Sequence, residues 1–234
     1  MNPHRGPVSL AIVDNSVMPD IYQPVRHWAQ HLPPGCDWQA FVARDHAFPR
    51  AADFSHVILT GSEASILDPD PWALEEVEWV REAVDAGLAV LGSCWGHQLL
   101  AYTLDGPGAV GRSARPEIGW LPIRVDAGDD ILGPRNPAAY AFTIHFDEVL
   151  DRGKGTFTVL ASTPSCPVHA ARWPQGRVWG IQAHPEVDIA TGTAFLRALV
   201  GAGFKGRDEL LAALRSEPID TGLIRAIVPA FLAS

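Results

Sequence analysis

The feature that most constrains this chain is a short apolar run, L-A-V-L-G at residues 88–92, which leads into the stretch G-S-C-W-G at residues 92–96. A strand with apolar side chains on both faces is typical of a parallel sheet covered by helices. Before the run, Asp70 and Pro71 are typical of a helix N-terminus, and apolar residues follow at helical spacing as far as residue 84. The run therefore predicts one strand of an α/β fold, with a helix on either side of it along the chain.

The N-terminal half extends this pattern. We expect strands at residues 8–15, 38–43 and 56–60, and helices at residues 20–32, 71–86 and 95–104. Strands that alternate with helices in this way indicate a three-layer α/β sandwich with right-handed crossovers.

The C-terminal half has a different pattern, in which short turns replace the long helices between strand-like segments. Strand-like segments joined by short turns predict an antiparallel or mixed extension of the sheet, at residues 118–125, 140–145, 157–162 and 178–183. Residues 188–234 predict a tail of two or three helices, with breaks at residues 201–206 and near Pro218. We find no boundary at which a second domain begins, so the expected fold is a sandwich with a mostly parallel central sheet, an antiparallel extension and a helical C-terminal tail.

Charge and hydropathy exclude several classes of function. The 234 residues carry a net charge of −9 without a lysine or arginine cluster, so nucleic acid and anionic membranes are not expected partners. No apolar segment is long enough to span a bilayer.

The cysteines and histidines give no sign of a disulfide framework or a metal site. Cys36, Cys94 and Cys166 are odd in number and widely spaced, as is typical of proteins from a reducing cytoplasm. The N-terminus lacks the features of a signal peptide, so we expect a cytoplasmic location. The nine histidines show no metal-binding spacing, and no metal is expected.

Cys94 stands where the predicted strand turns into the predicted helix. Gly92 and Gly96 flank it two residues on either side, and small residues at these positions permit the sharp turn of a nucleophile elbow. The N-terminus of the next helix points at the sulfur and favours a thiolate, while the N–H of Trp95 is placed to bind an oxyanion. The alternative is an inert, buried cysteine, which we would favour for a cysteine without these neighbours.

A nucleophilic cysteine needs a base, and the best candidate is His184, at the end of the predicted strand 178–183. If the chain stays extended across Pro185, Glu186 faces the same side as His184 and fixes its tautomer, in a Cys-His-Glu triad. The alternative is a polar turn without a catalytic role. Two further histidines compete for the role of base. His97 is expected to point along the surface of the helix, and His145 is expected to face the pocket.

With both segments in view, the sequence resembles the class I (triad) glutamine amidotransferase family. Gly92 to Gln98 resembles the nucleophile segment G-x-C-x-G-x-Q, and His184-Pro185-Glu186 resembles H-P-E. Two further segments match in the same order. L-T-G-S at residues 59–62 resembles the turn beside the oxyanion hole, and E-I-G-W at 117–120 with I-H-F-D-E-V at 144–149 resembles the segments leading to the glutamine pocket.

The resemblance implies a single domain over residues 1–234 with a flavodoxin-like core. It implies that Cys94 attacks a γ-glutamyl amide and that water hydrolyses the resulting glutamyl thioester, without metal or organic cofactor. It also implies oxyanion N–H groups at Gly61 and Trp95, and substrate-binding residues at Gln98, His145 and Ser62. The expected partner is glutamine or another small γ-glutamyl compound.

Some features depart from better-known members of the family. Trp95 is bulky and is expected to narrow the pocket, Asp105 replaces a usual glycine, and the helical tail is long, as in stand-alone members such as γ-glutamyl peptidases. Three functions therefore remain open. The chain is a stand-alone hydrolase of γ-glutamyl bonds, a glutaminase subunit that delivers ammonia to a separate synthase, or a non-catalytic or redox-sensing relative.

Overall fold

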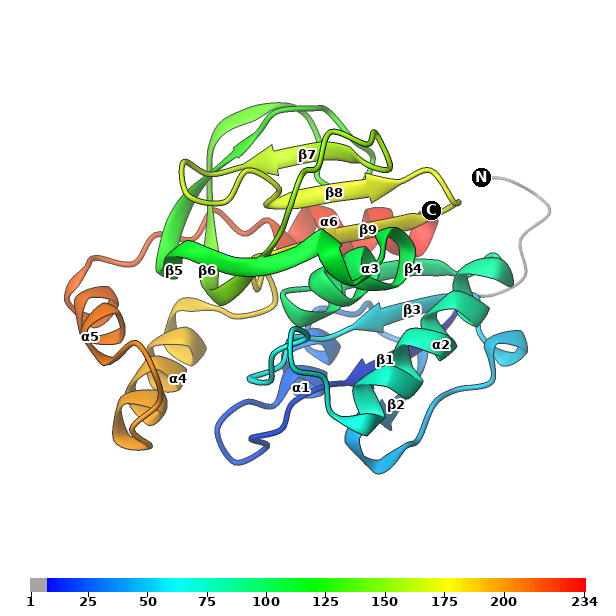
Figure 1. The fold of residues 1–234 in the computed structure, drawn as a ribbon, viewed down its shortest axis with the longest axis horizontal. Coiled ribbons are helices and arrows are strands. Elements are labelled where there is room, and N and C mark those ends of the chain that lie inside the picture. The colour runs from blue at the N-terminus through cyan, green and yellow to red at the C-terminus, as the bar shows by residue number, and fades with distance from the viewer. Residues whose placement is uncertain (1–7) are drawn as a thin grey trace.

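A computed structural model describes residues 8–234, in which one nine-stranded sheet runs through the molecule in the order β2-β1-β3-β4-β9-β8-β7-β5-β6 (Figure 1). One half of the sheet is parallel and consists of β2 (Asp37–Val42), β1 (Ser9–Asp14), β3 (His56–Leu59), β4 (Ala89–Ser93) and β9 (Val178–Ile181). The other half is antiparallel and consists of β8 (Ala170–Trp173), β7 (Thr158–Ser162), β5 (Val110–Val125) and β6 (Asn136–Val149). The predicted mostly parallel sheet with an antiparallel extension is confirmed, although β9, which was expected in the extension, pairs in parallel with β4.

Helices cover both faces of the parallel half. They are α1 (Pro24–Ala29), α2 (Pro71–Asp85), α3 (Trp95–Asp105) and α6 (Ile224–Ala233). Side chains of successive strand residues point to opposite faces, so Val57 and Leu59 of β3 pack on the side of α2 and α3, whereas Ile58 packs with α6. The result is the predicted three-layer arrangement.

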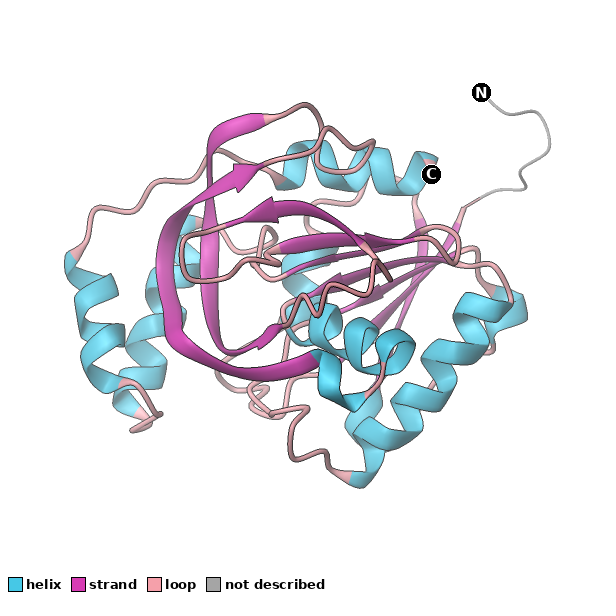
Figure 2. Ribbon diagram, turned by 45° about the horizontal axis from the view of Figure 1, so that its top comes forward, coloured by secondary structure: helices cyan, strands magenta, loops and turns pink. Residues whose placement is uncertain are grey.

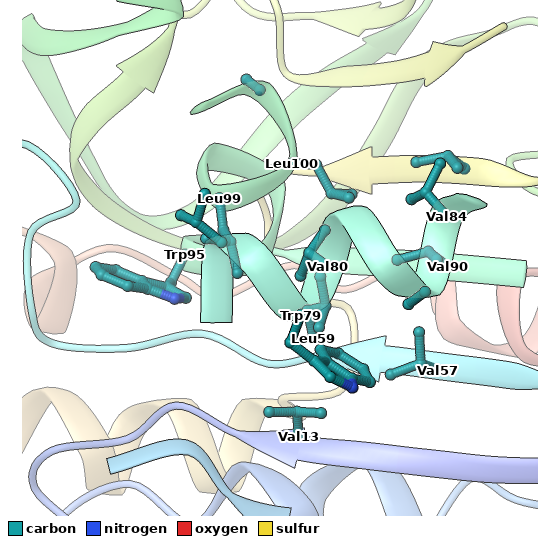
Figure 3. Close-up of a cluster of buried hydrophobic side chains, with 14 of the residues drawn as sticks. Val13, Val57, Leu59, Trp79, Val80, Val84, Val90, Trp95, Leu99 and Leu100 are labelled. Carbon is teal, nitrogen blue, oxygen red and sulfur yellow. The ribbon is translucent and has the colours of Figure 1, made fainter. Parts of the chain in front are cut away.

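The core between the sheet and helices α2 and α3 supports the strand-to-helix turn after β4. Figure 3 shows Val13, Val57 and Val90 of the strands facing Val80 of α2 and Leu99 of α3. All five side chains are fully buried, and each contributes about 1.5–3 kcal/mol of hydrophobic stabilisation relative to an exposed position. The turn that presents Cys94 is therefore anchored in a rigid part of the fold.

The C-terminal tail packs against the antiparallel half and returns to the parallel half. Helices α4 (Ile189–Gly201) and α5 (Arg207–Arg215) lie beside the curved β5–β6 hairpin (Figure 2). There Phe142 of β6 packs with Phe195 and Leu199 of α4. The predicted breaks at residues 201–206 and near Pro218 separate α4, α5 and α6.

The structure differs from expectation in three places. The helix expected at residues 20–32 begins only at Pro24, where a proline is favoured in the first turn, and the preceding residues form an irregular turn. Strand β8 was not predicted, because four residues, A-A-R-W, carry no alternation. Strands β5 and β6 are longer than expected, since they extend into segments that mix polar and apolar residues without regular alternation.

The targeting prediction at the N-terminus falls in part on residues 1–7, which lie outside the described residues. Within residues 8–234, no helix combines the length and apolar character that crossing a membrane requires.

Candidate active site

Cys94 occupies a strained turn between β4 and α3. Its backbone adopts φ 50° and ψ −101°, a conformation that costs a residue other than glycine about 1–3 kcal/mol. The turn is closed by the Cys94 N–H, which donates to the Ile181 carbonyl at 2.8 Å, and by the Gly96 N–H, which donates to the Thr60 carbonyl at 3.2 Å. Strain of this kind is characteristic of a nucleophile elbow.

The two glycines around Cys94 are required by close packing. A Cβ atom at Gly92 would collide with the backbone of Gly96, and one at Gly96 would collide with the backbone of Leu59, with the Leu59 Cβ 2.8 Å away. The elbow predicted from the G-S-C-W-G stretch therefore has the geometry that the two glycines indicate.

His184 and Glu186 form a buried hydrogen-bonded pair. His184 follows β9 and donates its backbone N–H to the Phe142 carbonyl at 2.8 Å. The imidazole Nδ1 lies 3.0 Å from Glu186 Oε1, and both side chains are almost fully buried. The pairing was predicted, but the extended conformation expected across Pro185 is wrong. The chain turns at Pro185 and Glu186, with a hydrogen bond of 3.1 Å from the Val187 N–H to the His184 carbonyl.

Tyr22 joins this pair, although no feature of the sequence predicts it. Its hydroxyl donates to Glu186 Oε1 at 2.8 Å and lies 3.1 Å from His184 Nδ1. The ring is buried and stacks on Phe195 of α4, with 5.2 Å between centroids. Tyr22 stands in the irregular turn before α1, 164 residues from Glu186, and no local pattern marks a single tyrosine in such a turn as part of a site.

The electrostatics of the pair favour a protonated imidazole. Burial by itself lowers the pKa of His184, but the Cys94 sulfur and the Glu186 carboxylate outweigh burial and raise this pKa to about 10. Burial raises the pKa of Glu186, yet His184 and the Tyr22 hydroxyl reverse this effect and lower it below its ordinary value. Burial, followed by the nearby Glu186 charge, raises the pKa of Tyr22 well above its ordinary value, so that Tyr22 acts only as a hydroxyl donor.

One cavity brings together most of the predicted site residues. Its lining includes Cys94, His184, Ser62, Gln98 and His145. The Cys94 thiol points toward the Ile144 carbonyl at 3.5 Å. Residues that follow β3, β4 and β9 thus meet residues of α3 and β6 at one end of the sheet, where the carboxyl ends of parallel strands place ligands in open α/β folds.

Two of the predicted substrate-binding side chains, Gln98 and His145, form hydrogen bonds with other residues of the chain. Gln98 Nε2 donates to the Asp147 carbonyl at 2.8 Å. The His145 ring bridges the Asp147 carbonyl, at 2.9 Å from Nδ1, and Glu117 Oε2, at 3.1 Å from Nε2. Because both ring nitrogens of His145 are hydrogen-bonded, neither is available to Cys94. His184 uses only Nδ1 for Glu186 and is the histidine that interacts with Cys94.

The two predicted oxyanion donors belong to Trp95, which follows Cys94 in the chain, and to Gly61, which packs against His184. The N–H of Trp95 is the first of α3 and therefore has no intrahelical partner. Gly61 follows β3 and packs against the imidazole, since a Cβ atom there would lie 2.5 Å from His184 Cε1.

The remaining expectations about the neighbours of Cys94 are corrected. The Trp95 side chain does not narrow the cavity, because its ring is buried beside Trp72 of α2, with 5.3 Å between centroids. His97 does not lie on the helix surface. It is fully buried, its Nε2 lies 3.1 Å from the Val168 carbonyl, and burial lowers its pKa to about 4.

Within residues 8–234, one group of side chains has the composition of a metal site. Ligand atoms of Glu117, His145 and Cys166 lie within 4.8 Å of one another, and all three residues are buried. The Glu117 carboxylate is already hydrogen-bonded to His145 and Thr163. Burial and the two nearby carboxylates, Glu117 and Glu148, raise the pKa of the Cys166 thiol well above its ordinary value, whereas a metal-binding cysteine is a thiolate. The group therefore fits an internal hydrogen-bonded network better than a metal site.

Comparison with known proteins gives a family match across the site. Residues 40–200 match the family model described as "Glutamine amidotransferase class-I". The chain is 42% identical over 148 residues to the glutamine-hydrolyzing GMP synthase of Aeropyrum pernix, covering 62% of this chain and 26% of that protein. It is 32% identical over 139 residues to one subunit of the glutamine-hydrolyzing GMP synthase of Sulfurisphaera tokodaii, covering 58% of this chain and 69% of the relative. The chain thus spans about a quarter of the length of the full GMP synthases it matches.

Solved structures give the same fold. A glutamine amidotransferase from Thermotoga maritima superposes with a TM-score of 0.73 at 20% identity, covering 98% of this chain and all of that one. A glutamine amidotransferase from Methylobacillus flagellatus superposes with a TM-score of 0.68 at 18% identity, covering 97% of this chain and 91% of that one. At this level of identity, these likenesses concern the fold alone.

Proposed function

Because this chain belongs to the class-I glutamine amidotransferase family, we propose that it hydrolyses a γ-glutamyl amide bond, in glutamine or in a γ-glutamyl conjugate, with Cys94 as the nucleophile. The observation that carries the proposal is the strained backbone of Cys94 in the same cavity as the buried His184–Glu186 pair. Strain at a reactive side chain beside a histidine–carboxylate pair is the arrangement that covalent acyl transfer requires.

The first half of the reaction forms a thioester. The proton of the Cys94 thiol resides on His184, whose raised pKa favours the imidazolium, and the Cys94 thiolate attacks the γ-carbonyl carbon of the substrate. The carbonyl oxygen becomes negative and is stabilised by the N–H groups of Gly61 and Trp95. The carbon–nitrogen bond then breaks, the leaving amine takes the proton from His184, and the glutamyl group stays on Cys94 as a thioester.

The second half returns the enzyme to its starting state. Water gives a proton to the now neutral His184 and attacks the thioester carbonyl, the carbon–sulfur bond breaks, and glutamate is released with the Cys94 thiolate and the His184 imidazolium restored. Glu186 holds the imidazole tautomer through its 3.0 Å hydrogen bond, and Tyr22 holds the Glu186 carboxylate. Gln98, Ser62 and His145 contribute to the pocket for the glutamyl group.

A second candidate function is that of a glutaminase subunit whose ammonia is used by a separate synthase. The observation that favours it is the similarity to a protein named as one subunit of GMP synthase, of which this chain covers 69%. The chemistry at Cys94 is the same in both cases, so the two functions differ only in the fate of the ammonia.

The proposal is tested by glutamate release from glutamine and from a panel of γ-glutamyl amides. We expect turnover by the wild-type protein, none by Cys94→Ala, and wild-type turnover by Cys36→Ala, which replaces a cysteine outside the cavity. Turnover only in the presence of a synthase would favour the subunit function. Absence of turnover under all these conditions would refute both.

A further inference from the structure

The lining of the cavity around Cys94 includes two carboxylates, and both are bonded to other residues of the chain. Glu63 accepts hydrogen bonds from the backbone N–H groups of Val17, at 3.0 Å, and Met18, at 3.2 Å. Asp147 accepts one from Ser65 at 2.6 Å and forms an ion pair with Arg112 at 2.7 Å. The oxygens of both acids are therefore already engaged in contacts within the chain.

Lys205 is the lysine of this cavity, and among the described residues no acidic side chain lies in contact with its ammonium. It lines the cavity, and within residues 8–234 its ammonium forms neither an ion pair within 4.0 Å nor a hydrogen bond. The ammonium lies over the ring of Phe146, 4.6 Å from the centroid, and 5.8 Å from the centroid of Phe204. Two aromatic faces thus hold a cation at the cavity, beside apolar surface.

The position of Lys205 is fixed by the short connection between α4 and α5. The Phe204 N–H donates to the Leu199 carbonyl at 3.0 Å, and Gly203 and Gly206 adopt positive φ angles of 70° and 75°. A Cβ atom at Gly206 would lie 2.8 Å from Phe146 Cζ, so the connection packs directly on β6. The cation is therefore supplied by an ordered turn, next to the β5–β6 hairpin (Figure 1).

Lys205 lies outside residues 40–200, the part of the chain that matches the family. The matched part contains Cys94 and the residues assigned to the glutamyl group. γ-Glutamyl compounds differ in the amine attached to the γ-carbonyl. A cation from outside the matched part is therefore a candidate to bind this variable amine part of the substrate.

We propose that Lys205 binds a carboxylate on the leaving amine, so that the preferred substrate is the γ-glutamyl amide of an amino acid. This inference rests on the proposed function of the same site. The carboxylate pairs with the ammonium, and the hydrocarbon part of the amino acid packs on Phe146 and Phe204. The carboxylate takes no part in bond breaking, since the amide nitrogen still receives its proton from His184 and leaves as the free amino acid.

The test compares two substrates that differ only in this charge, γ-glutamylglycine and γ-glutamylglycinamide. For the wild-type protein we expect kcat/KM to be about tenfold higher for the acid, the ratio typical of one hydrogen bond to a charged group. Lys205→Met keeps the apolar stem over Phe146 and should bring the ratio close to one, whereas Lys205→Arg should preserve the preference. Lys154→Met, which replaces an exposed lysine away from the cavity, is the matched control and should keep the wild-type ratio.

A binding measurement on the inactive Cys94→Ala variant tests this inference separately from the proposed function. In Cys94→Ala, calorimetry should show tighter binding of γ-glutamylglycine than of γ-glutamylglycinamide, and addition of Lys205→Met should abolish the difference. If Lys205→Met lowered kcat/KM equally for γ-glutamylglycine and γ-glutamylglycinamide, the inference would be overturned, because the lysine would then bind the glutamyl part. An unchanged ratio in Lys205→Met would also overturn it. Wild-type protein inactive on every γ-glutamyl compound would refute the proposed function, and the binding measurement would still decide the role of Lys205.

Discussion

Replacing Gly61 by alanine tests whether the imidazole of His184 must lie where the structure places it. The added methyl carbon would lie 2.5 Å from His184 Cε1, 3.1 Å from the Tyr22 hydroxyl and 3.3 Å from His184 Nδ1. Ordinary van der Waals contact begins near 3.4 Å, so the ring must retreat by about 1 Å. Gly61 lacks a positive φ, and alanine therefore adds no backbone strain of its own.

The retreat moves the base away from both of its partners. The 3.0 Å hydrogen bond to Glu186 and the alignment with Cys94 cannot both survive such a shift. A displacement of this size costs about 100-fold in rate, so we expect kcat for glutamate release to fall by about that factor, with KM near the wild-type value. Overpacking at the same point should lower the free energy of unfolding by about 1–3 kcal/mol.

Steady-state glutamate release and urea unfolding measure the two effects. Gly201→Ala is the matched control, because its methyl group meets nothing within 4 Å and the glycine has no positive φ, and it should keep the wild-type kcat. A folded Gly61→Ala protein with the wild-type kcat would refute the assignment of His184 as the base.

Three further substitutions have defined outcomes. Tyr22→Phe removes the donor to Glu186 and should lower kcat about tenfold without changing KM, whereas Tyr102→Phe should be silent in the same assay. Glu186→Gln should lower kcat on the order of 100-fold. It should also move the basic limb of the kcat/KM profile from near pH 10 to lower pH, because the Glu186 charge, which raises the pKa of His184 together with the larger effect of Cys94, is lost. Burial raises the pKa of Glu76 to about 8 from its ordinary 4.5, so the carboxyl stabilises the fold below pH 4.5 and this stability is lost as pH rises through 8. The loss is on the order of 5 kcal/mol, and Glu76→Gln should flatten it in urea unfolding measured between pH 5 and 9.

The elements around Cys94 could be predicted because local rules decide them. An apolar run buried on both faces, two glycines and a helix start follow one another within a few residues, and each has a local physical reason. The pairing of His184 with Glu186 was also predicted, although through an extended chain where the structure has a turn. Side chains two apart can meet in either conformation, so the spacing alone does not distinguish them.

Tyr22 and Lys205 could not be predicted, because long-range packing brings them to the cavity. Tyr22 stands before α1 in an irregular turn, and Lys205 stands in a connection of the C-terminal tail. Their roles depend on how α4 packs against β6, which the hydrophobic pattern of either element does not specify. His97 illustrates the same limit, since its burial against Val168 depends on the position of the segment before β8.

The central claim is that Cys94 carries the glutamyl group during turnover. Acid quenching during steady-state hydrolysis of glutamine, followed by peptide mass spectrometry, measures this directly. The account predicts a glutamyl adduct on the peptide that contains Cys94 and on no other cysteine peptide, and none in Cys94→Ala. An adduct on Cys36 or Cys166, or undiminished glutamate release by Cys94→Ala, would contradict it.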